Sequence, residues 1–314
     1  MIAHWDEIES YQSELGHLSG RWTDLAAASG ARRIGVNRIQ VTPGMWSTPA
    51  HIESAEEEIF YVLGGTGWSW QQLGAEGEVR MHEVAEGDVI VHLAGRERHT
   101  LLAGPDGLDV VAFGNRHPSQ FAYLPRGQVG WIGGTWTNAG DGEWPWAREV
   151  EAGPPEVVDA TERPQNIKRA DEVQPVWEGA VFPLASAAGS QQSGLNLVRL
   201  QPGAEAAPPH CHSMEDELFV VLDGEGTLHI EPTPAKREFG GEPEEHAIGP
   251  GHVASFPAGN NLCHSVTAGD AGLTFLAYGT RHPNDVIYYA RRNALFFKGL
   301  GVMVPVEHIG FLDG

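Results

Sequence analysis

The sequence predicts an all-β protein that is built from two copies of one β unit. The first observation is composition: 40 glycines and 21 prolines among 314 residues, together with short β-branched runs, are typical of many strands joined by tight turns. The second observation is an internal repeat. Residues 30–67 align with residues 189–226 without a gap, at a constant offset of 159, and 15 of the 38 aligned positions are identical.

The repeat continues beyond this first block. Residues 82–95 match residues 246–259, and residues 114–126 match residues 279–291. One unit of about 100 residues, the size of a small β domain, therefore occurs twice. The last block contains His117 in one copy and His282 in the other, each followed by a proline that favours extended backbone, so we expect a structural role for both histidines.

The chain divides into four segments. Residues 1–29 are expected to form short helices that pack on the β units, because their apolar residues recur at roughly helical spacing. Residues 30–125 form the first unit, residues 126–180 a connection, and residues 181–314 the second unit and a tail. The connection is expected to lie across a unit or an interface, because it carries four tryptophans that would be costly to leave in water: Trp131, Trp136, Trp144 and Trp146.

Charge and cysteine content exclude several classes of function. With 42 acidic and 20 basic residues, the formal net charge of −22 argues against binding to nucleic acid or to an anionic membrane, since both require basic patches. The expected partner is a small molecule or another copy of the chain. The sequence lacks a membrane-spanning run and a signal-peptide pattern, so we expect a soluble cytoplasmic protein. Two cysteines, Cys211 and Cys263, make no disulfide framework.

The stretch PPHCHSMEDELFVVLDGEG, which ends at residue 226, places candidate ligands at the start of an apolar run. Read as a strand, it directs His210 and His212 to one face and Cys211 to the other, where Cys211 can face Cys263. Residues 218–222 read as the next strand, with Glu217 at its head and a turn at residues 223–224 that ends it. Adjacent strands thus present two imidazoles and a carboxylate, whereas the neighbouring acids at 215 and 216 are interpreted as surface charge.

These residues resemble the first motif of the cupins, and the chain resembles a bicupin. The second cupin motif is matched by GHVASFPAGNNLCH, which supplies Gly251, Pro257, Gly259 and His264, with a longer gap than usual before the histidine. The resemblance implies that each unit is a small antiparallel barrel, a double-stranded β-helix or jelly roll, with one metal-sized site inside. It assigns four metal ligands to the second barrel: His210, His212, Glu217 and His264.

The chemistry of these residue types supports a metal independently. Three imidazoles and one carboxylate form a mixed nitrogen and oxygen set that suits divalent Mn, Fe, Co, Ni, Cu or Zn. Such a set leaves coordination positions open for water or substrate. We therefore expect a divalent transition metal (Fe, Mn, Ni, Cu or Zn) in the second barrel.

The first unit departs from the pattern. Glu53 stands where the second histidine is expected, and Leu93 stands where the proline is expected, while His51, Glu58 and His99 keep their places. Two histidines and two carboxylates can bind Zn, Mn or Fe. Two other interpretations stay open, namely that Glu53 turns away and side chains fill the site, or that its carboxylate acts as a base beside a substrate.

Function follows less directly, because fold does not determine chemistry. The first hypothesis is a metal-dependent enzyme of the dioxygenase type that acts on a small molecule in the second barrel. Alternatives are a non-oxidative enzyme, an isomerase or decarboxylase, and a non-catalytic protein that binds a small molecule. Self-association through the tryptophan-rich segment is also expected.

Overall fold

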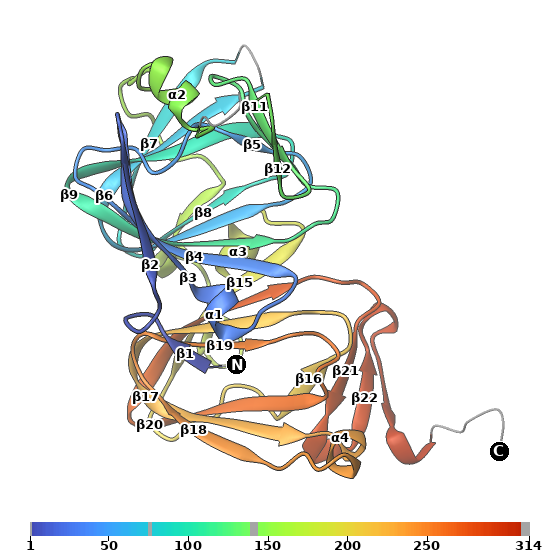
Figure 1. Ribbon diagram of the computed structural model, residues 1–314. Coiled ribbons are helices and arrows are strands. Elements are labelled where there is room, and N and C mark those ends of the chain that lie inside the picture. Colours follow the sequence, from blue (N-terminus) through green and yellow to red (C-terminus); the bar gives the residue numbers. More distant parts are fainter. Residues whose placement is uncertain (1, 75–76, 139–143, 309–314) are drawn as a thin grey trace.

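The computed structural model describes residues 2–74, 77–138 and 144–308, and it confirms the all-β fold. Figure 1 shows two barrels, one above the other, with the helix α1 (Leu25–Ser29) between them. The named strands pair antiparallel throughout. Within the described residues, no helix is long and apolar enough to cross a membrane.

The first barrel is a sheet in the order β13-β8-β6-β9-β4-β3-β2, with β7 added to β6. A separate small sheet has the order β12-β11-β10-β5. The bounds are β2 (Ser10–Leu15), β3 (Leu18–Asp24), β4 (Ile34–Val41), β5 (Ile52–Glu53), β6 (Glu58–Leu73), β7 (Val79–Ala85), β8 (Asp88–His92), β9 (Glu97–Asn115), β10 (Phe121–Leu124), β11 (Val129–Ile132), β12 (Thr135–Thr137), α2 (Ala147–Glu151), β13 (Ile167–Arg169) and the 3-10 turn η1 (Ala170–Glu172).

The second barrel is a sheet in the order β1-β19-β17-β20-β16-β21-β22-β23, with β15 also on β20, β14 on β15 and β18 on β17. The bounds are β1 (Ile2–His4), β14 (Val181–Phe182), α3 (Leu184–Ala187), β15 (Ser193–Leu200), β16 (His210–His212), β17 (Glu217–Pro232), α4 (Pro234–Glu238), β18 (Glu244–Ile248), β19 (His252–Phe256), β20 (Leu262–Thr280), β21 (Val286–Tyr289), η2 (Ala290–Arg292), β22 (Ala294–Phe297), η3 (Lys298–Leu300), β23 (Val302–Pro305) and η4 (Val306–His308).

The prediction of helices over residues 1–29 is wrong except for the five residues of α1. Strand β1 pairs with β19 of the second barrel, and the hairpin β2-β3 joins the first barrel through β4. Gly16, with φ +57°, adopts the left-handed conformation that the hairpin turn requires. Open strand edges on both barrels supply hydrogen-bond partners, and this tertiary pairing overrides the approximate helical spacing.

The predicted strand end at residues 223–224 is also wrong, because β17 continues through it to Pro232. The register against β20 shifts between Val221 and Asp223 and again between Gly224 and Gly226. Gly224 has φ +78°, and a Cβ on it would lie 2.2 Å from the carbonyl oxygen of Gly272. The glycine signal therefore marks a bulge that bends one long strand around the barrel.

The tryptophan-rich connection lies on the first barrel. Trp131 and Trp136 face each other across β11 and β12 at 5.0 Å between ring centroids, and Trp146 packs edge-on against Trp22 of β3. Trp131 and Trp144 stay about a third to a half exposed. Residues 139–143 of the predicted connection lie outside the described residues.

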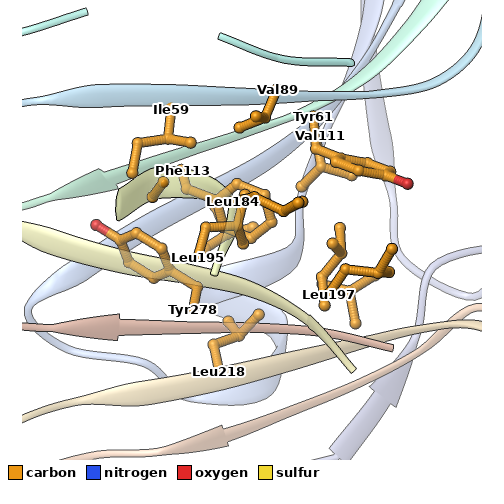
Figure 2. Close-up of a cluster of buried hydrophobic side chains, with 14 of the residues drawn as sticks. Ile59, Tyr61, Val89, Val111, Phe113, Leu184, Leu195, Leu197, Leu218 and Tyr278 are labelled. Atoms are coloured by element: carbon orange, nitrogen blue, oxygen red, sulfur yellow. The ribbon is translucent and has the colours of Figure 1, made fainter. Parts of the chain in front are cut away.

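One apolar core joins the two barrels. Figure 2 shows Ile59 and Phe113 of the first barrel meeting Leu218 and Tyr278 of the second. Ile59 pairs with Phe113 as Leu218 pairs with Tyr278, so these residues hold equivalent places in the two repeats. The rings of Phe113 and Tyr278 stack at 5.1 Å. The barrels thus pack through the same face, as the subunits of a two-fold symmetric dimer do.

Buried carboxylates reinforce this contact in both directions. Asp216 of the second barrel, whose side chain is 2% exposed, accepts hydrogen bonds from the backbone and the guanidinium of Arg33 in the first barrel, the shortest at 2.7 Å. Glu57, the equivalent residue of the first barrel, accepts from the Ser190 hydroxyl and from the backbone N–H of Gln192. The interpretation of Asp216 as surface charge is therefore wrong, because the sequence does not show that the other repeat covers it.

Replacing Arg33 with alanine leaves the buried Asp216 carboxylate with its backbone donors only. We expect the free energy of unfolding to fall by about 2 kcal/mol in chemical denaturation. Arg32→Ala, which removes the exposed neighbouring arginine, is the matched control and should change stability by less than about 0.5 kcal/mol. Equal unfolding midpoints for the two variants would contradict the importance of this contact.

Tyr278 gives the core a dependence on alkaline pH. Burial raises the pKa of its hydroxyl, which is hydrogen-bonded to Ser193 at 2.9 Å. The folded state thus favours the neutral phenol. The contribution of the Tyr278 hydroxyl to the free energy of unfolding is therefore complete below the unfolded pKa near 10. Above that pH it is lost by up to about 1.4 kcal/mol per pH unit. Tyr278→Phe should be less stable at neutral pH by about 1 kcal/mol. The difference in free energy of unfolding between the two proteins should narrow above pH 10. If chemical denaturation gives the same difference at neutral pH and above pH 10, this pH dependence is refuted.

Candidate metal centres

The second barrel brings the four sequence-predicted ligands to one point. Strand β16 carries His210 and His212, β17 begins with Glu217, and β20 places His264 directly opposite His210. The Nε2 atoms of the three histidines lie 3.6, 3.4 and 2.8 Å from Oε2 of Glu217, in the order His210, His212 and His264. Period-two alternation thus directs both β16 imidazoles inward, as the pattern predicts.

This set fits a cation. Within the described residues, Nε2 of His212, Oε2 of Glu217 and Nε2 of His264 are buried and have no hydrogen-bond partner of acceptable geometry. Buried polar atoms without a partner cost about 1–3 kcal/mol each, so native proteins rarely retain them without a purpose. The atoms are close but are not aligned as donor and acceptor, whereas a shared ion would satisfy all of them together.

The charges at this point also suit a ligand set. Burial alone would raise the pKa of Glu217, but the charge of His212 and the surrounding imidazoles hold it well below its ordinary value. Burial lowers the pKa of His264 to about 4, despite the nearby Glu217 carboxylate. At neutral pH the barrel therefore holds an ionised Glu217 and a neutral His264, which are the protonation states that bind metal. Despite burial, the carboxylates of Glu217 and Asp285 raise the pKa of His212 to about 10, so metal binding would release a proton from this imidazole.

Aromatic side chains surround the second site. Phe256 stacks on His264 at 3.8 Å between ring centroids, and Phe219 lies edge-on to the same ring at 5.4 Å. Tyr289 on β21 pairs with His210, and its ring lies over that imidazole at 5.9 Å. Sequence reasoning missed Tyr289, although the repeat offers a signal, since the equivalent position of the first barrel is Leu124.

The two cysteines lie on the opposite face of the same strands. Cys211 stands between His210 and His212, and Cys263 precedes His264, so that their sulfurs face each other at 3.5 Å. Both are buried free thiols. They therefore line the side of the sheet that points away from the four candidate ligands, as the period-two pattern predicts.

The acids before the ligand glutamates anchor loops. Glu215, interpreted above as surface charge, is buried and accepts from the backbone N–H of His282. Glu56 does the same for His117 in the first barrel. The two imidazoles in turn accept from backbone N–H groups two residues further on. This arrangement agrees with the structural role that we expected for both histidines.

The first barrel brings together a different set. His51 and His99, which face each other in an isolated β-bridge, hydrogen-bond to Oε2 of Glu58 at 3.1 and 2.7 Å. Oε1 of Glu53 lies 3.7 Å from Nε2 of His51, so Glu53 faces this group. Its second oxygen is buried without a hydrogen-bond partner in the described part of the chain, and burial raises the pKa of Glu53 to about 8.

The first barrel is also more polar behind its histidines. His92 pairs with Glu58 where Phe256 pairs with Glu217, and it stacks on His99 at 3.9 Å. Its Nδ1 lies 2.8 Å from Oε1 of Glu97, and both side chains are buried. Sequence reasoning missed this pair. The alignment of residues 82–95 with residues 246–259 contains the signal, because it sets a histidine against a phenylalanine.

Comparison with known proteins identifies the fold. The cupin domain family model matches residues 196–278, which lie within the second barrel. A search of curated proteins finds no match. Among solved structures, an oxalate decarboxylase from Bacillus subtilis, studied for its Mn(II) centres, is 15% identical with a TM-score of 0.61, over 91% of this chain and 78% of that chain.

Further structures of that enzyme give the same result. Its structure at pH 4.6 is 14% identical with a TM-score of 0.59, over 88% of this chain and 75% of that chain. A mutant of it is 16% identical with a TM-score of 0.62, over 91% and 78%. At these identities the likeness shows the fold alone. In this chain itself, the His and Glu groups described above support the expected divalent transition metal.

Replacing His212 with alanine should remove metal from the second barrel without unfolding the chain. We expect the metal content of purified protein to fall by about one equivalent per chain, measured by elemental analysis. The matched control is His229→Ala, because His229 also lies on the second barrel but bonds to Glu245 and Thr267 instead. Metal content unchanged in the His212 variant would show that this site does not hold the ion.

Proposed function

We propose a function from one premise, that the chain belongs to the cupin superfamily and is a bicupin, with two barrels of that fold. The second barrel is then a metal-dependent active site for a small organic anion. The reaction class is non-oxidative, and decarboxylation is its best-supported member, because the two-barrel neighbours are oxalate decarboxylases. The expected ligands of the ion are His210, His212, Glu217 and His264.

The observation that carries this proposal is the group of buried and unpartnered ligand atoms in the second barrel. One carboxylate faces this point, whereas both Glu53 and Glu58 face the corresponding point of the first barrel. A divalent ion would therefore leave net positive charge only in the second barrel. Because opposite charges attract strongly in a buried site, that barrel favours an anionic substrate.

The metal, when bound, supplies Lewis-acid polarisation of a substrate oxygen. The chain's own residues supply the surroundings. Phe219 and Phe256 pack on each other and on His264, so they exclude water from one side of the site. Tyr289, whose ring lies over His210, is the candidate hydrogen-bond donor to a substrate oxygen. Water exclusion favours loss of a charged carboxylate as neutral CO2, after which the carbon retains the electron pair and takes up a proton.

A dioxygenase is the second candidate, and the same ligand set supports it. Three imidazoles and one carboxylate also suit Fe or Cu, and open coordination positions would accept O2 together with an enolate or phenolate. The aromatic lining favours such a conjugated anion. A non-catalytic binding protein would bind the same anions at this site without turnover.

Gas exchange separates these candidates. Metal-free protein is reloaded separately with Mn, Fe, Ni, Cu and Zn and is tested with a panel of small carboxylates, enols and phenols. We expect CO2 release from a carboxylate without O2 consumption, and we expect this activity to be lost in His212→Ala and kept in His229→Ala. Stoichiometric O2 uptake would instead support the dioxygenase. If calorimetry shows that a compound of the panel binds but no metal gives turnover, both enzymatic functions are contradicted.

A further inference from the structure

We propose that Asp285 is a positioning residue that fixes the orientation and the tautomer of the His212 imidazole. The inference rests on the proposed metal site but concerns a residue outside the ligand set. Asp285 lies in the loop between β20 and β21, and its side chain is fully buried. Its Oδ2 lies 2.6 Å from Nδ1 of His212.

The carboxylate is itself held in place. Oδ1 of Asp285 accepts from the Ser213 hydroxyl at 3.0 Å and from the backbone N–H of Met214 at 2.8 Å. These bonds aim Oδ2 at the imidazole. Because an ionised carboxylate only accepts hydrogen bonds, Nδ1 of His212 carries the proton. When the ring binds a metal in its neutral form, its lone pair is on Nε2, which is the atom that points toward Glu217.

His212 differs in this respect from the other two histidines. Nδ1 of His210 bonds to the carbonyl oxygen of Pro208, and Nδ1 of His264 has no partner within the described residues. A carboxylate partner both fixes the ring and makes the opposite nitrogen a stronger donor to a metal. Among the three candidate histidine ligands, His212 is therefore the one whose binding to a metal depends most on a supporting residue, Asp285.

Comparison with the first barrel shows that a charged residue at the position of Asp285 occurs together with a histidine at the position of His212. At the position of His212 it has Glu53, and at the position of Asp285 it has Gln120. The amide oxygen of Gln120 accepts from the backbone N–H groups of Ala55 and Glu56, much as Asp285 accepts from Met214. A neutral amide is thus sufficient to hold this loop. The carboxylate occurs in the barrel where an imidazole needs a partner.

The two carboxylates behind His212, those of Glu215 and Asp285, do not require a cation site in addition to the candidate sites inside the two barrels. Oε2 of Glu215 lies 3.7 Å from Nδ1 of His212, and the three residues His212, Glu215 and Asp285 together resemble a ligand set. However, Lys298 already places its ammonium group on Glu215. The lysine supplies the positive charge that a cation would otherwise supply, which leaves Asp285 free to accept from His212.

Asp285→Asn tests the proposal, because asparagine keeps the shape and the acceptor for Met214. With Zn2+ and Mn2+ alone as probes, we expect competition against a chelating dye to show a 10- to 100-fold loss of affinity at the second site. Ser213→Ala is the matched control, since it removes another partner of Asp285 but leaves the carboxylate on His212. Its affinity should stay within about threefold of wild type.

A second measurement does not depend on any variant's folding or on bound metal. Imidazole 15N spectra of metal-free wild-type protein should show His212 with the proton on Nδ1 in a strong hydrogen bond. A His212 signal with Nδ1 unprotonated, or unchanged affinity in Asp285→Asn when His212→Ala has lost its metal, would overturn the proposal. Failure of wild-type protein to bind either metal would instead overturn the proposed function and leave the 15N result to decide the role of Asp285.

Discussion

In each barrel, the carboxylate that fastens it to the other barrel immediately precedes a candidate metal ligand. Asp216 precedes Glu217, and Glu57 precedes Glu58. Because side chains alternate along the extended chain, Asp216 faces the neighbouring barrel and Glu217 faces the interior. The bonds from Arg33 thus fix Asp216, the residue immediately before β17, from outside, and this helps to position Glu217. The barrel contact and the candidate metal centre share one stretch of backbone.

The two repeats use this common framework differently. The second barrel directs one carboxylate and three imidazoles at a single point and surrounds them with phenylalanines. The first barrel replaces one imidazole with Glu53 and one phenylalanine with His92, and it pairs Glu58 with its histidines by ordinary hydrogen bonds. Within the described residues, the candidate ligands of the first site are therefore satisfied without an ion apart from Glu53, although Nε2 of the neighbouring His92 is also buried without a partner, whereas those of the second site are not. This difference is the physical reason to expect anion chemistry in the second barrel.

Much of this arrangement could be predicted from the sequence. The ungapped match of residues 30–67 to residues 189–226 indicates two copies of one fold. The spacing of His210, His212 and Glu217 indicates their convergence, because side chains alternate strictly along a strand. The N-terminal strands could not be predicted in this way. Their conformation is determined by unpaired edges of β4 and β19, which belong to distant parts of the chain.

The same limit applies around the site. The sequence EDE at residues 215–217 gives no sign that Asp216 is covered by the other barrel or that Lys298 reaches Glu215. Asp285 follows Glu217 by nearly seventy residues, and only the pairing of β21 with β16 brings it to His212. Local patterns thus predict the ligands, but the residues that hold the ligands depend on tertiary pairing.

Anomalous diffraction from crystals of the protein, collected at the absorption edge of the metal found in it, tests the central claim most directly. The account predicts a peak inside the second barrel at about 2.0–2.3 Å from Nε2 of His210, His212 and His264 and from Glu217. Crystals grown with excess metal that show no peak there, with the histidines hydrogen-bonded to Glu217 instead, would contradict it.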